Sequence, residues 1–341
     1  MLTLDVKIEH WPFRETLRIS GYTFTEAKVV VVTLRSGEFV GQGEATGVYY
    51  HKETPASLTA QIDSVRPQIE AGISRDALRE LLPTGGARNA VDCALWDLQA
   101  KQTGTPAWQI AGLDKLGALR TTFTVGADTP DKMAAVARGY AHAPRLKLKL
   151  TGQDDAPRIK AIRAARPDAW IGIDANQGFT RATLEALMPV FIDANVSLIE
   201  QPVAVGNEAE LDGLNSPIPL AADESVQGLD DIEKAKGRFD VVNIKLDKCG
   251  GLTEALMMVN AIKAAGMRPM VGCMESTSLA MMPGCLVGQL CEIVDMDAPL
   301  FLATDRKPAV AYRNGEIICP ADGWGSARAF ALRHNEIQEE G

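Results

Sequence analysis

The stretch RLKLKL (145–150) decides the fold class, because its basic and apolar residues alternate with a period of two. This period is typical of a β-strand, and it places Arg145, Lys147 and Lys149 on one face and three leucines on the other. In isolation the segment would be explained by an edge strand with a solvated basic face, since lysines are mostly exposed. The segments that follow it change this interpretation.

Five further apolar segments have the length and composition of strands. They are WIGIDAN (170–176), SLIEQP (197–202), IPLAADES (218–225), DVVNIKL (240–246) and RPMVGCM (268–274). Alanine-rich segments with apolar residues three and four positions apart separate them, as expected for helices. Strands that alternate with helices predict an α/β fold with a parallel sheet. Helices cover the outside of a parallel barrel, so the lysine face of residues 145–150 is expected to point into it.

Charged residues end five of these segments at regular intervals. Lys149, Asp174, Glu200, Asp223 and Lys245 lie 25, 26, 23 and 22 residues apart. Each interval is close to the length of one strand, one helix and two short loops. Parallel barrels place their chemistry at the carboxyl ends of the strands, so these five side chains are expected to converge in one mouth.

Three of these residues, Asp174, Glu200 and Asp223, come from consecutive segments and predict a metal site. Three carboxylates within a few ångströms of one another could not all stay ionised without a cation. Every donor is an oxygen, which favours Mg²⁺ over zinc and leaves Mn²⁺ as the alternative. A single acid at a strand end could equally cap the next helix. Three in step make capping alone an insufficient explanation.

These motifs together resemble those of the enolase superfamily, in its muconate-lactonizing-enzyme subgroup. The matching motifs are KLK (147–149), DAN (174–176), EQP (200–202), ADES (222–225) and NIKLDKCGG (243–251). The resemblance spans essentially the whole chain. It implies a modified TIM barrel, (β/α)7β, with an N-terminal α+β capping domain.

The resemblance also implies how the chain is divided. We expect the capping domain in residues 1–113, completed by a C-terminal segment from about 305 to 341, and the catalytic barrel in residues 114–304, with strands beginning near Leu119. A cap hairpin is predicted from KVVVVTL (28–34) and GQGEA (41–45), which flank a turn at Ser36 and Gly37. RNAVDCALWDL (88–98) resembles the helix that links cap and barrel in the family. Its apolar residues fall on one face, namely Ala90, Val91, Ala94, Leu95 and Leu98.

In that family the equivalents of Asp174, Glu200 and Asp223 bind the metal, and those of Lys149 and Lys245 are the acid/base pair. The resemblance further implies that Lys147 and, more weakly, Thr124 contact substrate. Asn176 and Glu224 would orient the metal ligands, as neighbours of such ligands commonly do. Lys248 is expected to be solvated or structural.

The segment DMDAP (295–299) discriminates within the subgroup. It resembles the dipeptide epimerases, in which Asp295 and Asp297 would hold the ammonium group of an L-alanyl dipeptide. Two carboxylates with one residue between them on a strand face the same way and can share an ammonium with three donors. Cycloisomerisation by a muconate cycloisomerase, or dehydration to o-succinylbenzoate, would use the same metal and lysines. Those substrates have no ammonium group to bind.

The implied activity is a Mg²⁺-dependent epimerisation of the second residue of L-Ala-D/L-Glu or a related L-Ala-Xaa dipeptide, in murein peptide metabolism. Two lysines would carry out a 1,1-proton transfer through a metal-stabilised enolate. Each must be neutral to act as a base, so we expect its pKa to fall from about 10.4. Desolvation, the metal and the Lys147 cation would all lower that pKa.

Other enzyme and protein classes fit less well. The mandelate-racemase subgroup uses a histidine base, and the four histidines avoid the expected strand ends; they are His10, His51, His142 and His334. A binding protein with a degenerate site would not need a second lysine. A Schiff-base aldolase needs one lysine and no metal triad.

Specificity is expected to come from two cap loops, at residues 14–26 and about 46–53. The first contains Arg18 and Phe24, which are candidates for substrate contact. Alanyl-glutamate epimerases place a cation in this loop, and in some relatives that arginine aligns nearer Phe24 than Arg18. The resemblance therefore does not imply a strict preference for glutamate. Arg18 could substitute if the loop brings it inward, and Phe24 could instead pack the cap.

Composition excludes several partners. A net charge of −9 over 341 residues argues against nucleic acid and against an anionic membrane surface as partners. The partner that the resemblance implies is a small-molecule dipeptide substrate. No apolar run reaches the 18–20 residues of a membrane span, and the start lacks the form of a signal peptide. Six cysteines without a C-x-x-C motif indicate reduced thiols in a cytoplasmic protein. Nucleotide-binding motifs are absent, and assembly into a homo-oligomer stays open.

Overall fold

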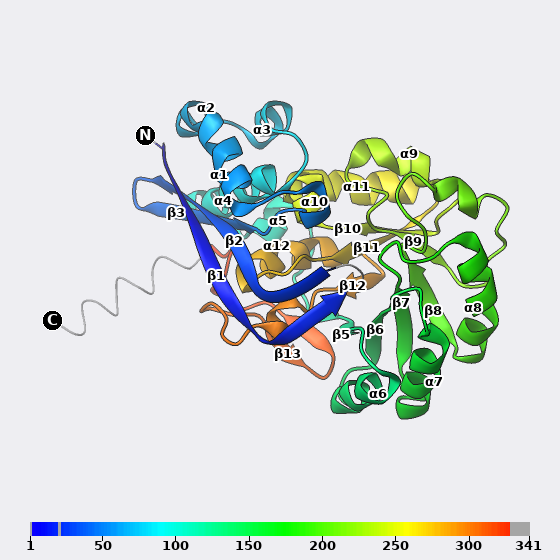
Figure 1. Ribbon diagram of the computed structural model, residues 1–341. Helices are drawn as coiled ribbons and strands as arrows, with labels where there is room; N and C mark the ends of the chain where they lie inside the picture. Colours follow the sequence, from blue (N-terminus) through cyan, green and yellow to red (C-terminus); the bar gives the residue numbers. More distant parts are fainter. Residues whose placement is uncertain (1, 20–21, 328–341) are drawn as a thin grey trace.

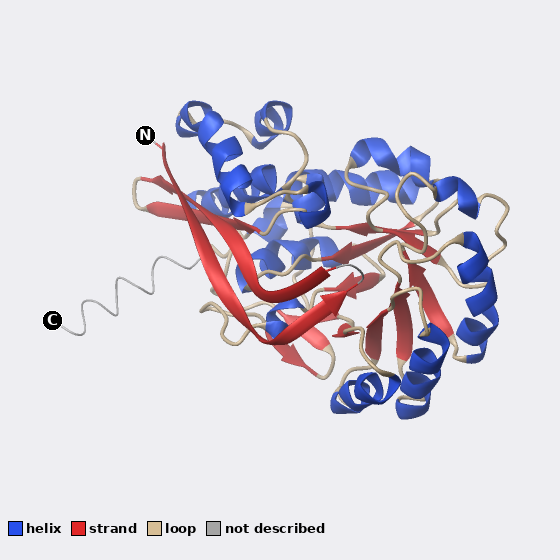
Figure 2. Ribbon diagram, in the orientation of Figure 1, coloured by secondary structure: helices blue, strands red, loops and turns tan. Residues whose placement is uncertain are grey.

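The computed structural model describes residues 2–19 and 22–327 of the chain. An antiparallel sheet and its helices, at the left of Figure 1, pack beside a larger parallel sheet that is ringed by helices. The predicted α/β fold, a modified TIM barrel with an N-terminal capping domain, is thereby confirmed. Figure 2 shows the barrel strands inside and the helices outside.

The barrel is an eight-stranded sheet whose neighbouring strands are parallel and follow chain order. Its strands are β5 (Phe123–Val125), β6 (Arg145–Lys149), β7 (Trp170–Asp174), β8 (Val196–Glu200), β9 (Leu220–Ala222), β10 (Val241–Ile244), β11 (Arg268–Gly272) and β12 (Ile293–Asp295). The first and last strands also approach each other, because the Thr122 amide donates to the Val294 carbonyl at 2.9 Å. All six segments predicted as strands are therefore strands of one barrel.

Helices connect these strands and cover the outer face of the sheet (Figure 2). They are α6 (Pro130–Gly139), α7 (Asp155–Ala165), α8 (Arg181–Asp193), α9 (Ile232–Ala235), α10 (Leu246–Cys249), α11 (Leu252–Ala264) and α12 (Ser278–Gly288). Leu146, Leu148 and Leu150 are fully buried in the large core that includes helix residues such as Ile159 and Ile162. The alternation in residues 145–150 thus has its predicted outcome, with leucines facing the helices.

A small apolar cluster fills the barrel below its mouth. Its members are Leu198, Ala221, Val241, Met270 and Ile293, with Trp170 packed against them. Because strand side chains alternate, the residues two positions further along face the same way. For β8 and β12 those residues are Glu200 and Asp295, and for β9 it is Asp223, the residue directly after the strand. The cluster therefore forms the floor of the barrel mouth, one layer of side chains below its charged residues.

The cap begins with three antiparallel strands, β1 (Leu2–Ile19), β2 (Tyr22–Ser36) and β3 (Phe39–Ala45). Its helices are α1 (Pro55–Ser64), α2 (Arg66–Glu70), α3 (Arg75–Leu81), α4 (Gly86–Thr103) and α5 (Ala107–Ile110). The hairpin predicted from residues 28–45 is present. The expectation of a loop over residues 14–26 is wrong, because β1 and β2 extend through most of it. Leu17 pairs with Phe24 and Arg18 with Thr23, beyond an irregularity after Pro12.

Helix α4 joins the cap to the barrel with two faces. Ala90, Val91, Ala94 and Leu98 are buried in the cap core, with Leu95 packed at its edge, as the sequence predicted. The opposite face contacts the barrel through polar side chains. Arg88 donates to the Cys249 carbonyl at 2.6 Å and to Glu254 at 2.7 Å. Asp92 accepts from the Thr253 amide at 3.0 Å and its hydroxyl at 2.5 Å.

A third sheet corrects the predicted start of the barrel. Strand β4 (Leu119–Arg120) pairs with β14 (Glu316–Ile318), which pairs with β13 (Ala311–Arg313), so the barrel begins at β5 and not near Leu119. Past residue 305 the chain touches the cap. Arg306 binds Glu9 and Glu44, and Trp324 donates to the Gln42 carbonyl at 2.9 Å. Residues 328–341 of the predicted C-terminal segment lie outside the described residues, and the domain limits stay a prediction.

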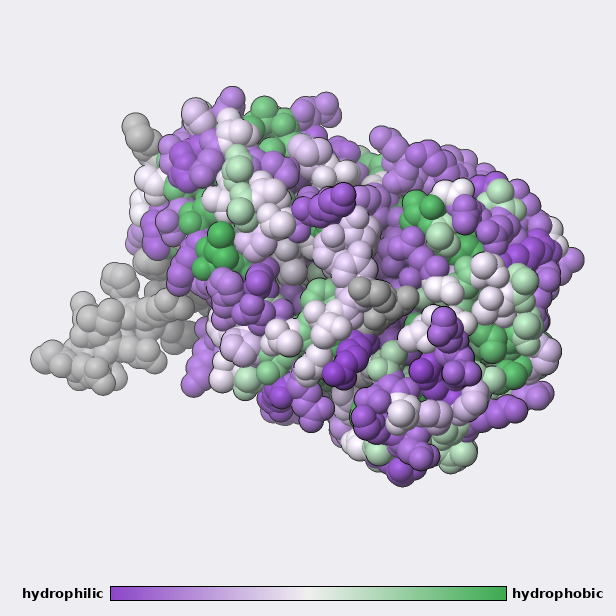
Figure 3. All heavy atoms as spheres, in the orientation of Figure 1, coloured by the Kyte–Doolittle hydropathy of each residue, from purple (hydrophilic) through white to green (hydrophobic). Residues whose placement is uncertain are grey.

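Hydrophilic residues predominate on the face of the molecule that Figure 3 shows, and the apolar residues there are scattered. Within residues 2–19 and 22–327, no helix combines the length and apolar character that a membrane crossing requires.

The close contact of β3 with α4 gives a stability prediction. A Cβ built at Gly43 would overlap the Ala90 carbonyl oxygen and lie 2.7 Å from the Ala94 amide nitrogen. We expect Gly43→Ala to lower the free energy of unfolding by about 1–3 kcal/mol, because backbone atoms cannot move aside cheaply. Gly139→Ala in α6 is the control, since nothing lies within 4 Å of its Cβ position. Equal thermal unfolding midpoints for the two variants would contradict this packing argument.

Candidate active site

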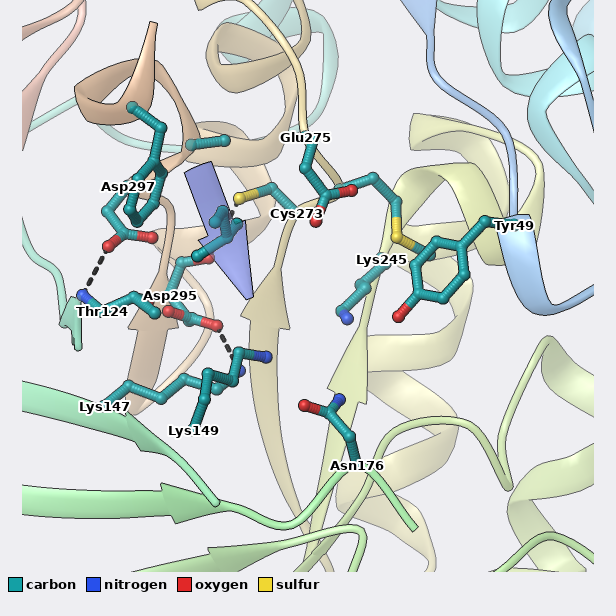
Figure 4. A pocket seen from close by; sticks show the side chains of 14 residues that line it. Tyr49, Thr124, Lys147, Lys149, Asn176, Lys245, Cys273, Glu275, Asp295 and Asp297 are labelled. Atoms are coloured by element: carbon teal, nitrogen blue, oxygen red, sulfur yellow. Dashed lines mark hydrogen bonds and ion pairs between the residues drawn. The ribbon is translucent and has the colours of Figure 1, made fainter. Parts of the chain in front are cut away.

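A cavity opens at the carboxyl ends of the barrel strands, between the barrel and the cap (Figure 4). It measures about 50 Å³, well below the ~300 Å³ at which small-molecule sites usually begin. Residues that line it must therefore move to admit a dipeptide-sized ligand. The lining consists of Leu17, Tyr49, Thr124, Lys147, Lys149, Asn176, Lys245, Cys273, Met274, Glu275, Asp295, Asp297, Ala298 and Phe301.

The three predicted metal-binding acids meet beneath this cavity. Oxygen atoms of Asp174, Glu200 and Asp223 lie within 4.8 Å of one another. The residues are 0%, 1% and 1% exposed. Buried carboxylates at this spacing require compensating positive charge, and the all-oxygen donor set suits a hard divalent cation. The residues present therefore fit Mg²⁺.

Neighbouring side chains hold Glu200 and Asp223 in place. Asn243 donates to Glu200 at 2.6 Å. Lys248, which is buried, donates to the Asp223 carboxylate at 2.7 Å and to its carbonyl at 2.5 Å. The Gln201 side chain accepts from the Asp223 amide at 2.9 Å. Lys248 is therefore structural and not solvated, which decides between the two roles that the sequence left open.

Lys147 joins the metal-site acids to the acid pair of the last strand. Its ammonium lies 3.0 Å from Asp174, 2.8 Å from Glu200 and 2.6 Å from Asp295. Burial alone would lower the pKa of Lys147, but these carboxylates outweigh it and raise that pKa well above its ordinary value. Lys147 is thus a permanent cation at the centre of the mouth.

The acids respond unequally to their burial. Burial would raise the pKa of Asp174, but Lys149 and Lys147 lower it to about 2. Burial and the Asp174 charge raise the pKa of Glu200 to about 7. Asp223 is buried too, yet Lys245 and Lys248 hold its pKa far below the usual range. The surrounding lysines therefore neutralise Asp174 and Asp223 and leave Glu200 short of positive charge.

The two proposed bases, Lys149 and Lys245, reach the cavity from strands on opposite sides of the barrel, and Figure 4 shows them separated across it. Lys149 lies 2.7 Å from Asp174, and Lys245 lies 2.6 Å from Asp223. Burial would lower the pKa of Lys245, but Asp223 and Glu200 raise it well above its ordinary value. From the sequence, the pKa of Lys245 is expected to fall below its ordinary value, whereas in the structure that pKa is raised. A cation bound by the acids would compete with the lysine for the same oxygens.

Asp295 and Asp297 both line the cavity, the first as the last residue of β12 and the second two residues beyond it. Asp295 accepts from the Thr122 hydroxyl at 2.5 Å, and Asp297 accepts from the Thr124 amide at 2.6 Å. Burial and the Asp295 charge raise the pKa of Asp297 to about 7. Burial would also raise the pKa of Asp295, but the Lys147 ammonium outweighs burial and lowers that pKa. Asp297 is therefore the member of the pair that has no cationic partner within residues 2–19 and 22–327.

Asn176 and Glu224 lie beside the metal-site acids. The Asn176 amide donates to Asp174 at 2.9 Å, and its side chain approaches Glu224 at 3.4 Å. Burial and the Asp223 charge raise the pKa of Glu224 to about 7. One side-chain oxygen of each residue is buried with no hydrogen-bond partner in the described part of the chain. Both are placed where they can orient a ligand of the metal.

The cap contributes Leu17 from β1 and Tyr49 from a short 3-10 helix, η1 (Tyr49–His51), to the cavity wall. The expected second cap loop is therefore at the site. Arg18 and Phe24, the candidates from the first cap segment, are not among the lining residues. Arg18 is exposed and lines an adjoining groove, and the Phe24 ring packs edge-on against Tyr49 with centroids 5.3 Å apart. Their roles in binding stay a prediction.

Asn243 and Glu275 are two polar residues of the site that were missed from the sequence. Asn243 could have been found, because it lies two residues before Lys245 on the same strand and so faces the same way. Glu275 follows β11 in a segment without regular periodicity, and no pattern indicated its direction. It lines the cavity beside Met274.

Comparison with known protein families agrees with this geometry. Residues 1–112 match the N-terminal domain of the mandelate racemase / muconate lactonizing enzyme family, and residues 131–327 match the enolase C-terminal domain-like family. The chain belongs to the enolase superfamily. Its place is in the muconate-lactonizing-enzyme subgroup, and it is an isomerase of the racemase and epimerase type.

Several similar proteins of the superfamily are known. L-Ala-D/L-Glu epimerase of Escherichia coli (strain K12) is 39% identical over 93% of this chain and 99% of the relative. An enolase family member from Agrobacterium tumefaciens, solved with sodium and L-Ala-L-Glu, has a TM-score of 0.93 and 39% identity, covering 95% and 100% of the two chains. Dipeptide epimerase from Methylococcus capsulatus, complexed with Mg and L-Arg-D-Lys, has a TM-score of 0.86 and 27% identity, covering 94% and 97%.

The acid cluster of this enolase-superfamily chain makes a prediction about metal binding. We expect Mg²⁺ at a hundred times its Kd to stabilise the protein by about 2.7 kcal/mol, because only the folded chain assembles the three acids. Glu200→Gln should reduce this stabilisation, since it removes one charged ligand without changing shape. Glu233→Gln, at an exposed site in α9, is the control. Thermal unfolding with and without Mg²⁺ measures the effect, and an equal shift in both variants would exclude Glu200 as a ligand.

Proposed function

We propose that this chain is a Mg²⁺-dependent dipeptide epimerase that inverts the second residue of L-Ala-D/L-Glu or a related L-Ala-Xaa dipeptide. One observation carries the proposal. Two lysines from opposite sides of the barrel and a pair of acids suited to an ammonium group line one cavity, and the two lysines form ion pairs with members of a buried cluster of three acids suited to a divalent cation. Mn²⁺ is the alternative ion, since it shares the preference for oxygen ligands.

The lysines are placed for proton transfer at one carbon. Lys149 ends β6 and Lys245 directly follows β10, and these strands are four apart in the eight-stranded barrel. A carbon held between them presents one face to each ammonium or amine. One lysine removes the α-proton, and the other delivers a proton to the opposite face, which inverts the configuration. A cycle in either direction needs one lysine neutral and the other protonated.

The remaining residues of the site position the two charged ends of the dipeptide. Lys147 supplies a fixed positive charge for the substrate carboxylate, and Asp295 and Asp297 accept hydrogen bonds from its ammonium group. Asp174, Glu200 and Asp223 would hold Mg²⁺, which when bound supplies positive charge to the carboxylate as its α-proton is lost. Tyr49 and Leu17 of the cap exclude water from the site, so that each charge acts in a low dielectric.

The acid pair also favours an epimerase over the other activities of this site. Muconate cycloisomerase and o-succinylbenzoate synthase substrates carry no ammonium group. For such a substrate, two buried carboxylates at the end of β12 would be an unfavourable wall. Incubation with Mg²⁺ and a set of L-Ala-L-Xaa dipeptides in D₂O tests the proposal. Deuterium at the second α-carbon is expected, and turnover of a succinylbenzoate precursor without dipeptide exchange would overturn it.

We also propose murein peptides as the source of substrate and the cytoplasm as the compartment. Support for the first is the similarity to a relative named L-Ala-D/L-Glu epimerase. The second is supported by the six cysteines, all free in the described part of the chain, because disulfides are rare in the cytoplasm.

The lysine pair gives a two-sided prediction. Lys149→Ala and Lys245→Ala should each abolish epimerisation, because one face of the α-carbon loses its proton donor and acceptor. Each variant should still exchange the α-proton of one epimer, with opposite epimers for the two variants. Mass spectrometry of L,L- and L,D-dipeptides in D₂O measures this, with Lys160→Ala on the exposed face of α7 as the control. Normal epimerisation in either variant would remove that lysine from the mechanism.

Asp297 predicts a pH dependence of dipeptide binding. Its pKa of about 7 means that the carboxylate is protonated below that pH and charged above it. The dipeptide ammonium loses its proton above about 8. Affinity should therefore rise through pH 7 and fall above 8, and Asp297→Asn should lose the rising limb and about tenfold in affinity. Calorimetry in saturating Mg²⁺ measures this, with exposed Asp193→Asn as the control. An unchanged profile for Asp297→Asn would contradict the ammonium role.

A further inference from the structure

Glu275 is a carboxylate of the cavity that the proposed mechanism does not use. It lies three residues beyond the end of β11 and lines the cavity. Its Oε2 atom is buried and has no hydrogen-bond partner among the described residues. Buried carboxylate oxygens are rarely left without a partner, because desolvating them costs free energy that a hydrogen bond would offset. The group therefore needs an explanation.

The electrostatics of Glu275 agree with a missing partner. Burial raises the pKa of its carboxyl group, and Lys149, Lys245 and Lys147 offset this only in part. Those lysines are already paired with Asp174, Asp223 and other acids at 2.6–3.0 Å. None of these three lysines forms an ion pair with Glu275. In Figure 4 the Glu275 carboxylate lies at the top of the site, away from Lys147 and Lys149 at its lower left.

The strand order shows which part of a dipeptide would face Glu275. The metal-site acids lie at the carboxyl ends of β7, β8 and β9, and Asp295 and Asp297 lie at the carboxyl end of β12, across the barrel. A planar enolate between the two lysines would direct its carboxylate towards the first group and its nitrogen towards the second. Its third substituent, the side chain, must then point along the barrel axis. The apolar cluster closes the floor, so the side chain points towards the cap.

Glu275 lies at that cap side. Its carbonyl accepts a hydrogen bond of 2.6 Å from the hydroxyl of Thr46, which begins the second cap segment. Tyr49 and Leu17, the cap residues of the cavity, complete this part of the wall. The lining contains no arginine among the described residues. Arg18 instead lines the adjoining groove with Asp128 and Lys132.

The geometry points to Glu275 as a specificity-determining residue that binds a positively charged side chain on the second residue of the dipeptide. This inference rests on the proposed function and deepens it. A lysine-type side chain would bring an ammonium group to the unpartnered Oε2 atom, with Tyr49 and Leu17 contacting its methylene chain. A glutamate side chain would instead bring a second carboxylate to the same wall.

The test compares four dipeptides that differ only in the end of the second side chain. L-Ala-L-Lys is paired with L-Ala-L-norleucine, which lacks the ammonium group, and L-Ala-L-Gln is paired with L-Ala-L-Glu. Initial rates of α-deuterium incorporation give kcat/KM for the wild type and for Glu275→Gln, which keeps the shape and removes the charge. Glu292→Gln, at an exposed residue before β12, is the matched control.

We expect the kcat/KM of the wild type to be about tenfold higher for the lysine dipeptide than for the norleucine dipeptide, which corresponds to about 1.4 kcal/mol. We also expect it to be higher for the glutamine dipeptide than for the glutamate dipeptide. Glu275→Gln should remove both preferences, whereas Glu292→Gln should keep them. A wild type that prefers glutamate to glutamine would overturn the inference, because Glu275 would then act as a protonated donor. Preferences that survive in Glu275→Gln would overturn it as well.

Failure of the epimerase proposal can be distinguished from failure of the Glu275 inference. If no dipeptide exchanges deuterium, the epimerase proposal fails, and calorimetric titration of the same four dipeptides in Mg²⁺ then decides on Glu275. Tighter binding of L-Ala-L-Lys that is lost in Glu275→Gln supports the subsite. Equal binding of all four dipeptides, or none, overturns it.

Discussion

The Lys147 ammonium, buried between Asp174, Glu200 and Asp295, is the interaction on which the rest of the structure depends. It joins β6 to β7, β8 and β12 at distances of 2.6–3.0 Å, and so spans the mouth of the barrel. Removing one partner of such a buried pair typically costs about 3–5 kcal/mol, because an uncompensated charge remains. The barrel must therefore close with the carboxyl ends of β6, β7, β8 and β12 near one another. The apolar cluster beneath these ends determines how deep in the barrel the charged side chains lie.

The mouth nevertheless carries more carboxyl groups than lysines. Four ammonium groups face seven carboxyl groups, namely those of Asp174, Glu200, Asp223, Glu224, Glu275, Asp295 and Asp297. Burial raises the pKa of Glu200, Glu224 and Asp297 to about 7, which shows where positive charge is short. A divalent cation and an ammonium group would supply three positive charges at these places. The chain's own side chains thus define the charge of what it binds.

The sequence predicted this mouth because its residues lie on strands, where a period of two fixes which way each side chain faces. Regular spacing then assigned Lys149, Asp174, Glu200, Asp223 and Lys245 to one rim. The cap was less predictable. Residues 14–26 have polar residues and a glycine typical of a loop, yet pairing across the sheet extends both strands there. Glu275 was missed for a related reason, since its direction depends on contacts with the cap and not on any local pattern.

Cap and barrel are held together by contacts of unequal strength. The cavity of about 50 Å³ must widen to admit substrate, so the weaker of these contacts is expected to open first. Helix α4 is anchored by a buried ion pair between Arg88 and Glu254 at 2.7 Å. The cap segment at Thr46 is held by its amide on Asp247 at 2.9 Å and by its hydroxyl on the Glu275 carbonyl. A neutral hydrogen bond such as that to the Glu275 carbonyl contributes only about 0.5–1.5 kcal/mol, and one to a carboxylate such as Asp247 about 1.5–3 kcal/mol. Breaking a buried ion pair costs about 3–5 kcal/mol, so the Thr46 contacts should yield before α4 does. Glu275 would then both hold the cap segment through its backbone and contact the substrate through its side chain, which couples closure to the charge of the bound residue.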